Sequence, residues 1–452
     1  MSIIPDIEGP VPPEEPAPGV SDEAAPGTGL RAMFGSLRIR NYRLFCLGQL
    51  FSNTGQWTQR IAQDWLVLSI TGNTTDVGIT TALQFVPSLF FALPGGVIAD
   101  RYPKRRILQV TQTGMALLAA VLAVLTLTHT VRAWHIFVIA FVLGSFSSVD
   151  NPTRQSFVNE LVGSSKLRNA ISLNSAIFQS GALVGPAVSG VLINLVGPGY
   201  SFAINALSFA APLTALALMD TSRILRRAVP ARAPGQLRDG LRYVRDRPSL
   251  LWPTVMVGVF GMFAGNMQVT LAALAKYVFR TGAGGYGTLA SVMAVGSLAG
   301  ALLTATGLPR LRWVAQCGLA VAALDVIASQ VPGQLAFSAL LLAIGVFSMM
   351  MLASANTVVQ VTAGDHIRGR VMSVYFMVYL LSAAVGGPLI GAIDQHLGPR
   401  VGLFIIGVVP GTVIGLVSLR LALLSRRGGR PGPRRAGAPD PAGPPELAPP
   451  EG

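Results

Sequence analysis

Long apolar runs separated by short polar segments dominate this chain. A helix that crosses a bilayer needs about 20 mostly apolar residues, and about twelve runs of that kind follow one another. Several contain Pro or Gly, which spanning helices tolerate. We therefore predict an all-α membrane protein whose twelve transmembrane helices occupy roughly residues 43–70, 76–98, 106–128, 134–155, 168–195, 200–219, 250–275, 286–306, 312–331, 333–358, 370–393 and 400–424.

The composition supports a membrane location. Of the 452 residues, 51% are hydrophobic and only 12% are charged, whereas soluble domains carry roughly 25% charged residues. The net charge of +14 would suit nucleic acid, but the basic residues lie in short clusters between the apolar runs. Such clusters set the orientation of membrane helices, so we expect a lipid bilayer and no nucleic acid as partner.

The positions of Lys and Arg predict the topology. If both termini lie in the cytoplasm, 29 of the 34 basic residues fall on the inner side and Arg60 falls within a helix. The positive-inside rule favours this orientation, in a multi-pass protein of the cytoplasmic membrane. The basic residues then left outside are Arg132, Lys276, Arg280 and Arg400.

The two halves of the chain look duplicated. A Gly-Pro pair of the fifth run recurs in the eleventh run 202 positions later, and an Asn–Gln pair at the end of the fourth run recurs in the tenth 205 positions later. These pairs are Gly185-Pro186 with Gly387-Pro388, and Asn151/Gln155 with Asn356/Gln360. Such repeats are typical of alternating-access carriers. We predict a disordered acidic, Pro-rich tail over 1–36, a six-helix bundle over 37–219, a basic cytoplasmic linker over 220–249, a second six-helix bundle over 250–424 and a disordered tail over 425–452.

Three groups of residues resemble a known family. GGVIADRYPKRR, from Gly95 to Arg106, resembles the loop between helices two and three of the major facilitator superfamily. The fifth-run pattern of Gly181, Gly185, Pro186 and Gly190 resembles the fifth-helix motif of its proton-driven exporters. WTQRIAQDWLVL (57–68) and DHIRGRVMS (365–373) resemble the bacterial branch of enterobactin-exporter-like and transmembrane secretion effector proteins. The resemblance covers residues 37–424, although Pro103 replaces a usual glycine and the corresponding loop of the second half, 307–313, lacks the aspartate.

The resemblance implies a cytoplasmic gate at this first loop. Asp100 would hold the inner side shut against a basic residue of the fourth helix and the start of the eleventh, and Arg154 is the natural cationic partner. Gly96 and Arg101 belong to the same motif. The alternative is that Asp100 and Arg101 are interfacial charges that only fix topology, as we expect for Lys104 and its two arginine neighbours.

Two charges in the first run are candidates for proton coupling. Arg60 and Asp64 lie four positions apart and share a helix face, and charges inside a membrane are costly and usually functional. Asp64 either exchanges the coupling proton or forms a structural ion pair with Arg60. We expect a water-filled cavity along the polar stripe of Gln49, Ser52, Asn53, Gln56, Gln59, Arg60 and Gln63. For the lone carboxylate Asp325 of the ninth run we expect a structural partner.

The resemblance places helices one, four, seven and ten around a substrate cavity. The cavity candidates are Gln56, Ser148, Asn151, Asn266, Gln268, Asn356 and Gln360. Gly181, Gly185, Pro186 and Gly190 give one face of the fifth run small residues that let backbones approach closely. They form either the hinge and seal of an exporter or ordinary packing.

The sequence predicts a secondary active transporter, most simply a monomeric, proton-coupled exporter of small amphipathic molecules such as drugs, siderophores or secondary metabolites. No Walker A, G-x-S-x-G or H-E-x-x-H motif occurs, so we expect no enzyme, no cofactor and no metal site. The alternatives are an uptake carrier of the same fold and a membrane scaffold or sensor that does not transport.

Overall fold

The computed structural model describes residues 35–163, 166–225, 236–304, 310–364 and 367–428. The side chains of residues 92–97, 99, 100, 168, 236–238 and 421–428 lie outside this description. The long helices are α2 (Arg40–Thr71), α3 (Thr74–Arg101), α4 (Lys104–Leu127), α5 (Ala133–Val162), α6 (Leu167–Val196), α12 (Gly282–Thr304), α13 (Leu311–Gln330), α14 (Gln334–Ala363), α15 (Arg368–Leu397) and α16 (Pro399–Gly428). The shorter ones are η1 (Gly35–Arg38), α7 (Pro198–Ser208), α8 (Ala210–Leu218), η2 (Thr221–Arg223), α9 (Gln236–Arg245), α10 (Pro248–Met262), η3 (Ala264–Asn266), α11 (Met267–Ala273) and η4 (Leu274–Val278).

The prediction of an all-helical membrane protein is confirmed. Ten helical segments among the described residues are long and apolar enough to span a bilayer. Helices α2 and α3 contain 32 and 28 residues and are therefore long enough, since a span needs about 20. The total of twelve crossings stays a prediction.

Three local features add detail that the sequence prediction did not contain. The sixth apolar run is divided at Phe209 into α7 and α8. The seventh run is divided at residues 263–266, where α10 ends in a short 3-10 turn before α11 begins. Finally, the segment predicted as a linker contains a helix, α9, whose residues Leu241 and Arg242 are exposed while Val244 is buried.

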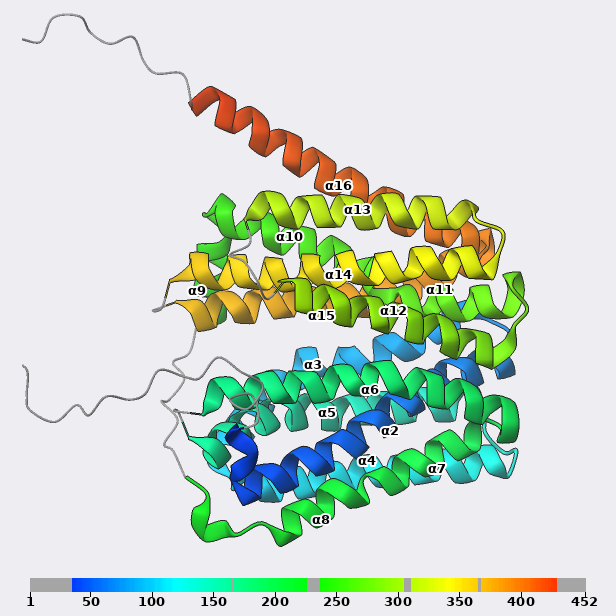
Figure 1. Ribbon diagram of the computed structural model, residues 1–452, viewed down its shortest axis with the longest axis vertical. Coiled ribbons are helices and arrows are strands. Elements are labelled where there is room, and N and C mark those ends of the chain that lie inside the picture. Colours follow the sequence, from blue (N-terminus) through cyan, green and yellow to red (C-terminus); the bar gives the residue numbers. More distant parts are fainter. Residues whose placement is uncertain (1–34, 164–165, 226–235, 305–309, 365–366, 429–452) are drawn as a thin grey trace, which may run out of the picture.

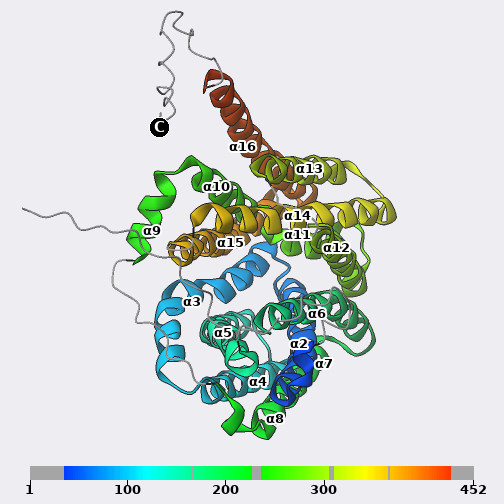
Figure 2. The ribbon, with the colours of Figure 1, turned by 60° about the vertical axis from the view of Figure 1, so that its left-hand side comes forward.

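The long helices lie side by side in two groups, one from each half of the chain (Figure 1). Helices α2–α8 form the N-terminal half and α9–α16 the C-terminal half (Figure 2). Two helix pairs, α3 with α15 and α6 with α12, pack across the junction of the halves. The exact bundle boundaries stay a prediction.

Glycines make close contact possible at both helix pairs. A Cβ on Gly78 of α3 would lie 2.0 Å from the carbonyl oxygen of Gly387 on α15, and one on Gly287 of α12 would lie 2.8 Å from the Cα of Gly190 on α6. Real Cβ atoms do not approach other atoms this closely. The backbones therefore touch directly, as small residues permit between membrane helices.

The turn between α2 and α3 defines one end of the molecule. Gly72 adopts φ 64° and its N–H bonds to the carbonyl of Leu68, which ends α2, and the side chain of Asn73 accepts from the N–H of Thr75, which begins α3. We call the end that contains this turn the distal end. The opposite end, where α2 begins at Arg40 and α3 ends at Arg101, is the proximal end.

Candidate functional site

Asp64 lies at the junction of the two halves. It belongs to α2, seven residues before the helix ends and hence about 10 Å from the distal turn at 1.5 Å per residue, and it is only 2% exposed. The hydroxyl of Tyr286 on α12 donates to Asp64 Oδ2 at 3.0 Å, whereas Asp64 Oδ1 has no hydrogen-bond partner among the described residues. A buried carboxylate with a spare oxygen suits proton exchange, because an unpaired charge there is costly.

Arg60 shares the face of Asp64, but the described structure contains no close ion pair between them. The guanidinium carbon of Arg60 lies 5.6 Å from the ring centre of Trp57 and 5.4 Å from that of Phe85 on α3, and Arg60 is partly exposed. Contacts of this kind hold a cation by attraction to the aromatic face. Whether Asp64 exchanges the coupling proton or serves as a structural partner of Arg60 stays a prediction.

Four further hydrogen bonds join the halves at the distal end. Lys276 Nζ donates to the carbonyl of Leu68 at 2.6 Å, and Tyr277 Oη donates to the carbonyl of Gly72 at 2.8 Å. Gln395 Oε1 accepts from both the backbone N–H and the hydroxyl of Thr74, each at 2.9 Å. The C-terminal half thus binds the end of α2 and the start of α3, which closes the distal end.

Most of the polar stripe on α2 packs inside the N-terminal half rather than facing an open cavity. Asn53 donates to the carbonyls of residues 177 and 178 on α6, and Gln59 accepts from Asn205 of α7 at 2.6 Å. Gln56 donates to Ser52 on its own helix and keeps partial exposure. These contacts follow because a polar side chain in a membrane helix needs a partner on a neighbouring helix. A water-filled cavity along the stripe stays a prediction.

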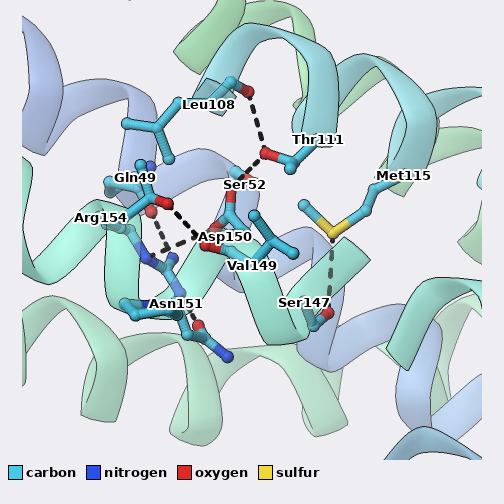
Figure 3. Close-up of polar contacts among 12 residues, drawn as sticks. Gln49, Ser52, Leu108, Thr111, Met115, Ser147, Val149, Asp150, Asn151 and Arg154 are labelled. Carbon is cyan, nitrogen blue, oxygen red and sulfur yellow. Dashed lines mark hydrogen bonds and ion pairs between the residues drawn. The ribbon is translucent and has the colours of Figure 1, made fainter. Parts of the chain in front are cut away.

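A second polar cluster joins α2, α4 and α5 at the proximal end (Figure 3). Asp150 is 3% exposed, and its Oδ1 accepts from Thr111 Oγ1 at 2.7 Å while Arg154 Nε lies 3.7 Å from its Oδ2. Arg154 also donates to Gln49 Oε1 at 2.7 Å and to Asn151 Oδ1. Arg154, predicted as the partner of Asp100, is therefore bound to Asp150, a pairing that their spacing of four residues could have indicated.

The gate motif is only partly described. The side chain of Asp100 lies outside the described residues, so the roles of Asp100 and Gly96 stay predictions, while Arg101 is exposed at the end of α3. Lys104 does more than set topology, because its Nζ lies 2.6 Å from Glu160 Oε1 with both side chains largely buried. This ion pair joins the start of α4 to the end of α5.

The fifth-helix motif uses its small residues in two directions. A Cβ on Gly181 would meet the Asn53 amide at 2.3 Å, and one on Gly185 would meet Trp57 Cβ at 2.4 Å, so this part of α6 packs closely on α2. Gly190 and the carbonyl of Pro186 instead face Gly287 of α12. The motif thus packs one half internally and also touches the other half; its role as hinge and seal stays a prediction.

The predicted cavity residues do not form one cluster. Ser148 donates to the carbonyl of residue 145, and Asn266 donates to the carbonyls of residues 261 and 262 at the break before α11. Gln360 donates to Asn356 and is exposed near the proximal end, as is Asn151. The side-chain oxygen of Gln268 is buried without a partner among the described residues. The role of all seven candidates, Gln56 and Asn151 included, stays a prediction.

Two other carboxylates lie inside membrane helices. Asp394 of α15 accepts from Thr270 Oγ1 of α11 at 2.8 Å. Asp325 of α13 is completely buried, and neither of its oxygens has a hydrogen-bond partner among the described residues. The expectation of a structural partner for Asp325 is therefore wrong for the described part of the chain.

The fold, the membrane-length helices and the polar contacts between two halves define a membrane transport protein. Residues 31–426 match the family described as transmembrane secretion effector. The chain belongs to this family of MFS-type transporters, and the resemblance predicted from its sequence is confirmed.

Individual relatives agree with this assignment. The chain is 27% identical over 406 residues to the multidrug efflux pump Tap of Mycolicibacterium fortuitum. This match covers 84% of this chain and 95% of that protein. It is 31% identical over 156 residues to the staphyloferrin A transporter of Staphylococcus aureus, a match that spans only 34% of this chain and 39% of that protein. A bacterial homolog of the human lysosomal transporter Spinster, in an inward-facing and unoccupied conformation, shares the fold with a TM-score of 0.66 at 14% identity, over 88% of this chain and 100% of that chain.

Proposed function

We propose that this protein is a proton-coupled exporter of small amphipathic molecules, such as drugs, siderophores or secondary metabolites, in the cytoplasmic membrane. The proximal end and both termini face the cytoplasm in this proposal, because that orientation places most basic residues inside. The named relatives include a multidrug efflux pump and a staphyloferrin A transporter, which supports the substrate class.

The observation that carries the proposal is the position of Asp64. It is the titratable acceptor in a set of distal hydrogen bonds whose other acceptors are the backbone carbonyls of Leu68 and Gly72 and the amide of Gln395. A proton on Asp64 therefore changes the contact between the halves, which proton coupling requires. The membrane potential adds about 2.3 kcal/mol per charge for each 100 mV.

The contacts between the halves also support an assignment of the conformational state of the carrier. The distal end is closed by hydrogen bonds, whereas Gln155 at the proximal end of α5 and Val361 at that of α14 are exposed. In the proposed orientation this is a state closed to the outside. An exporter loads its substrate from the cytoplasm in such a state.

Everted membrane vesicles test the proposal. With an imposed pH gradient that is acidic inside, vesicles containing the protein should accumulate a fluorescent dye or a ferric siderophore chelate, and Asp64→Asn should abolish this accumulation. Asp325→Asn is the matched control, since it removes a buried carboxylate that belongs to α13. Accumulation only in right-side-out vesicles would show an uptake carrier, and no gradient-driven movement of any probe would favour a scaffold or sensor.

A further inference from the structure

The distal contacts differ in one chemical respect. Lys276 and Tyr277 donate to backbone carbonyls of α2 and of the turn after it, and a carbonyl does not change its charge. Tyr286 instead donates to a carboxylate. The strength of this one hydroxyl contact therefore depends on whether Asp64 carries a proton.

We infer that Tyr286 is the positioning residue through which the charge of Asp64 controls the opening of the distal end. This inference rests on the proposed role of Asp64 as a proton site. Tyr286 of the C-terminal half thereby joins a proton site whose carboxylate lies on α2.

The environment of the pair isolates this hydrogen bond from bulk water. Asp64 is 2% exposed and Tyr286 is completely buried, and the ring of Tyr286 stacks on Trp65 with 6.5 Å between the ring centres. The stacking fixes the ring, so the hydroxyl reaches Asp64 Oδ2 only while α12 and α2 are in contact. Opening the distal end must break the bond.

The charged and titratable groups around the pair come from three elements, α2, α15 and η4. Arg60 precedes Asp64 by one turn of α2, and Tyr379 of α15 lies within electrostatic range of Arg60. Lys276 of η4 binds the carbonyl of Leu68 one turn beyond Asp64. Arg60 and Lys276 are the cations of this set.

The direction of the effect follows from bond strength. A hydrogen bond to an ionised acceptor is roughly twice as strong as one to a neutral acceptor, so ionised Asp64 holds the distal end closed and a proton weakens that closure. The stabilisation is present at high pH and is lost as the pH falls through the titration of Asp64. An ionised carrier without substrate thus stays closed to the outside, which limits slippage in an exchanger.

Spin labels measure the opening directly. Thr130 and Leu335 are exposed residues of the two halves, each beside an interhelical turn, and Thr130→Cys/Leu335→Cys labels in a background with Cys46→Ala and Cys317→Ala report their separation. In the otherwise unchanged protein, the ratio of open to closed molecules should rise about tenfold from high to low pH, the difference expected between a charged and a neutral acceptor. Tyr286→Phe, which keeps the stacked ring, should remove this pH dependence.

Tyr277→Phe is the matched control because it removes a hydroxyl bond to a backbone carbonyl from the same end. It should increase opening at every pH and keep the tenfold response. A pH response retained in Tyr286→Phe, or lost in Tyr277→Phe, would overturn the inference. If Asp64→Asn abolishes proton-driven accumulation while Tyr286→Phe still responds to pH, only the inference fails; if the unmutated protein shows neither response, the proposed function fails with it.

Discussion

A single added methyl group at Gly78 should prevent closure of the distal end. In Gly78→Ala the new Cβ would lie 2.0 Å from the carbonyl oxygen of Gly387, 2.5 Å from its carbonyl carbon and 2.9 Å from the nitrogen of Pro388. All three are backbone atoms, so no side-chain rotation relieves the contact. Ordinary contact begins at 3.4 Å, and α3 and α15 must therefore separate by about 1.4 Å.

Overpacking of this kind costs about 1–3 kcal/mol. At 1.4 kcal/mol per factor of ten, the ratio of open to closed molecules should rise about 5-fold to 150-fold. The same spin labels at Thr130 and Leu335 measure this ratio, and vesicle accumulation should fall with it. The matched control is Gly369→Ala on α15, whose Cβ would have no other atom within 4 Å. A Gly78→Ala protein that closes and transports like the unmutated protein would show that the α3–α15 contact does not limit closure.

Three further substitutions test other contacts. Arg154→Met removes the cation beside the buried carboxylate of Asp150 and should lower the free energy of unfolding by about 1–3 kcal/mol. This loss is smaller than for a fully buried ion pair because Arg154 is partly exposed. Thermal unfolding in detergent measures the loss, and adding Asp150→Asn should restore part of it. Asp325→Leu replaces a buried acid without a described partner and should raise the unfolding free energy by about 1–3 kcal/mol without changing accumulation in vesicles; lost accumulation would contradict a passive role. Lys276→Met removes a charged donor from the carbonyl of Leu68 and should increase distal opening about tenfold in the spin-label assay, and an unchanged ratio would refute a contribution to closure.

The membrane helices were predictable because their signal is local. About 20 consecutive apolar residues define a span without any knowledge of neighbours. The breaks were not predictable in this way. The helix can break near Asn266 because the side-chain amide of Asn266 donates hydrogen bonds to the carbonyls of residues 261 and 262. These hydrogen bonds depend on the rotamer of Asn266, which the pattern of apolar and polar residues does not predict.

The candidate site was predictable only in part for a related reason. Asp64 stood out because a carboxylate in an apolar run is unusual, and its burial agrees with that signal. Tyr286 was missed because a tyrosine at the start of an apolar run is an ordinary interfacial residue. Its importance depends on a contact between residues 222 positions apart, and such pairings require the packing of the two halves.

The α3–α15 pair links the two ends of the molecule. These helices touch at Gly78 and Gly387 near the distal end, and the proximal end of α3 at Arg101 belongs to the same helix pair as Arg370 in the first turn of α15. If the halves rock as rigid units, separation at Gly78 must bring these proximal ends closer. A disulfide between Arg101→Cys and Arg370→Cys should therefore form faster when Gly78→Ala holds the distal end open than in the otherwise unchanged protein, with Gly369→Ala again as control. Equal rates of cross-linking, read from gel mobility, would show that the two ends do not move in opposition.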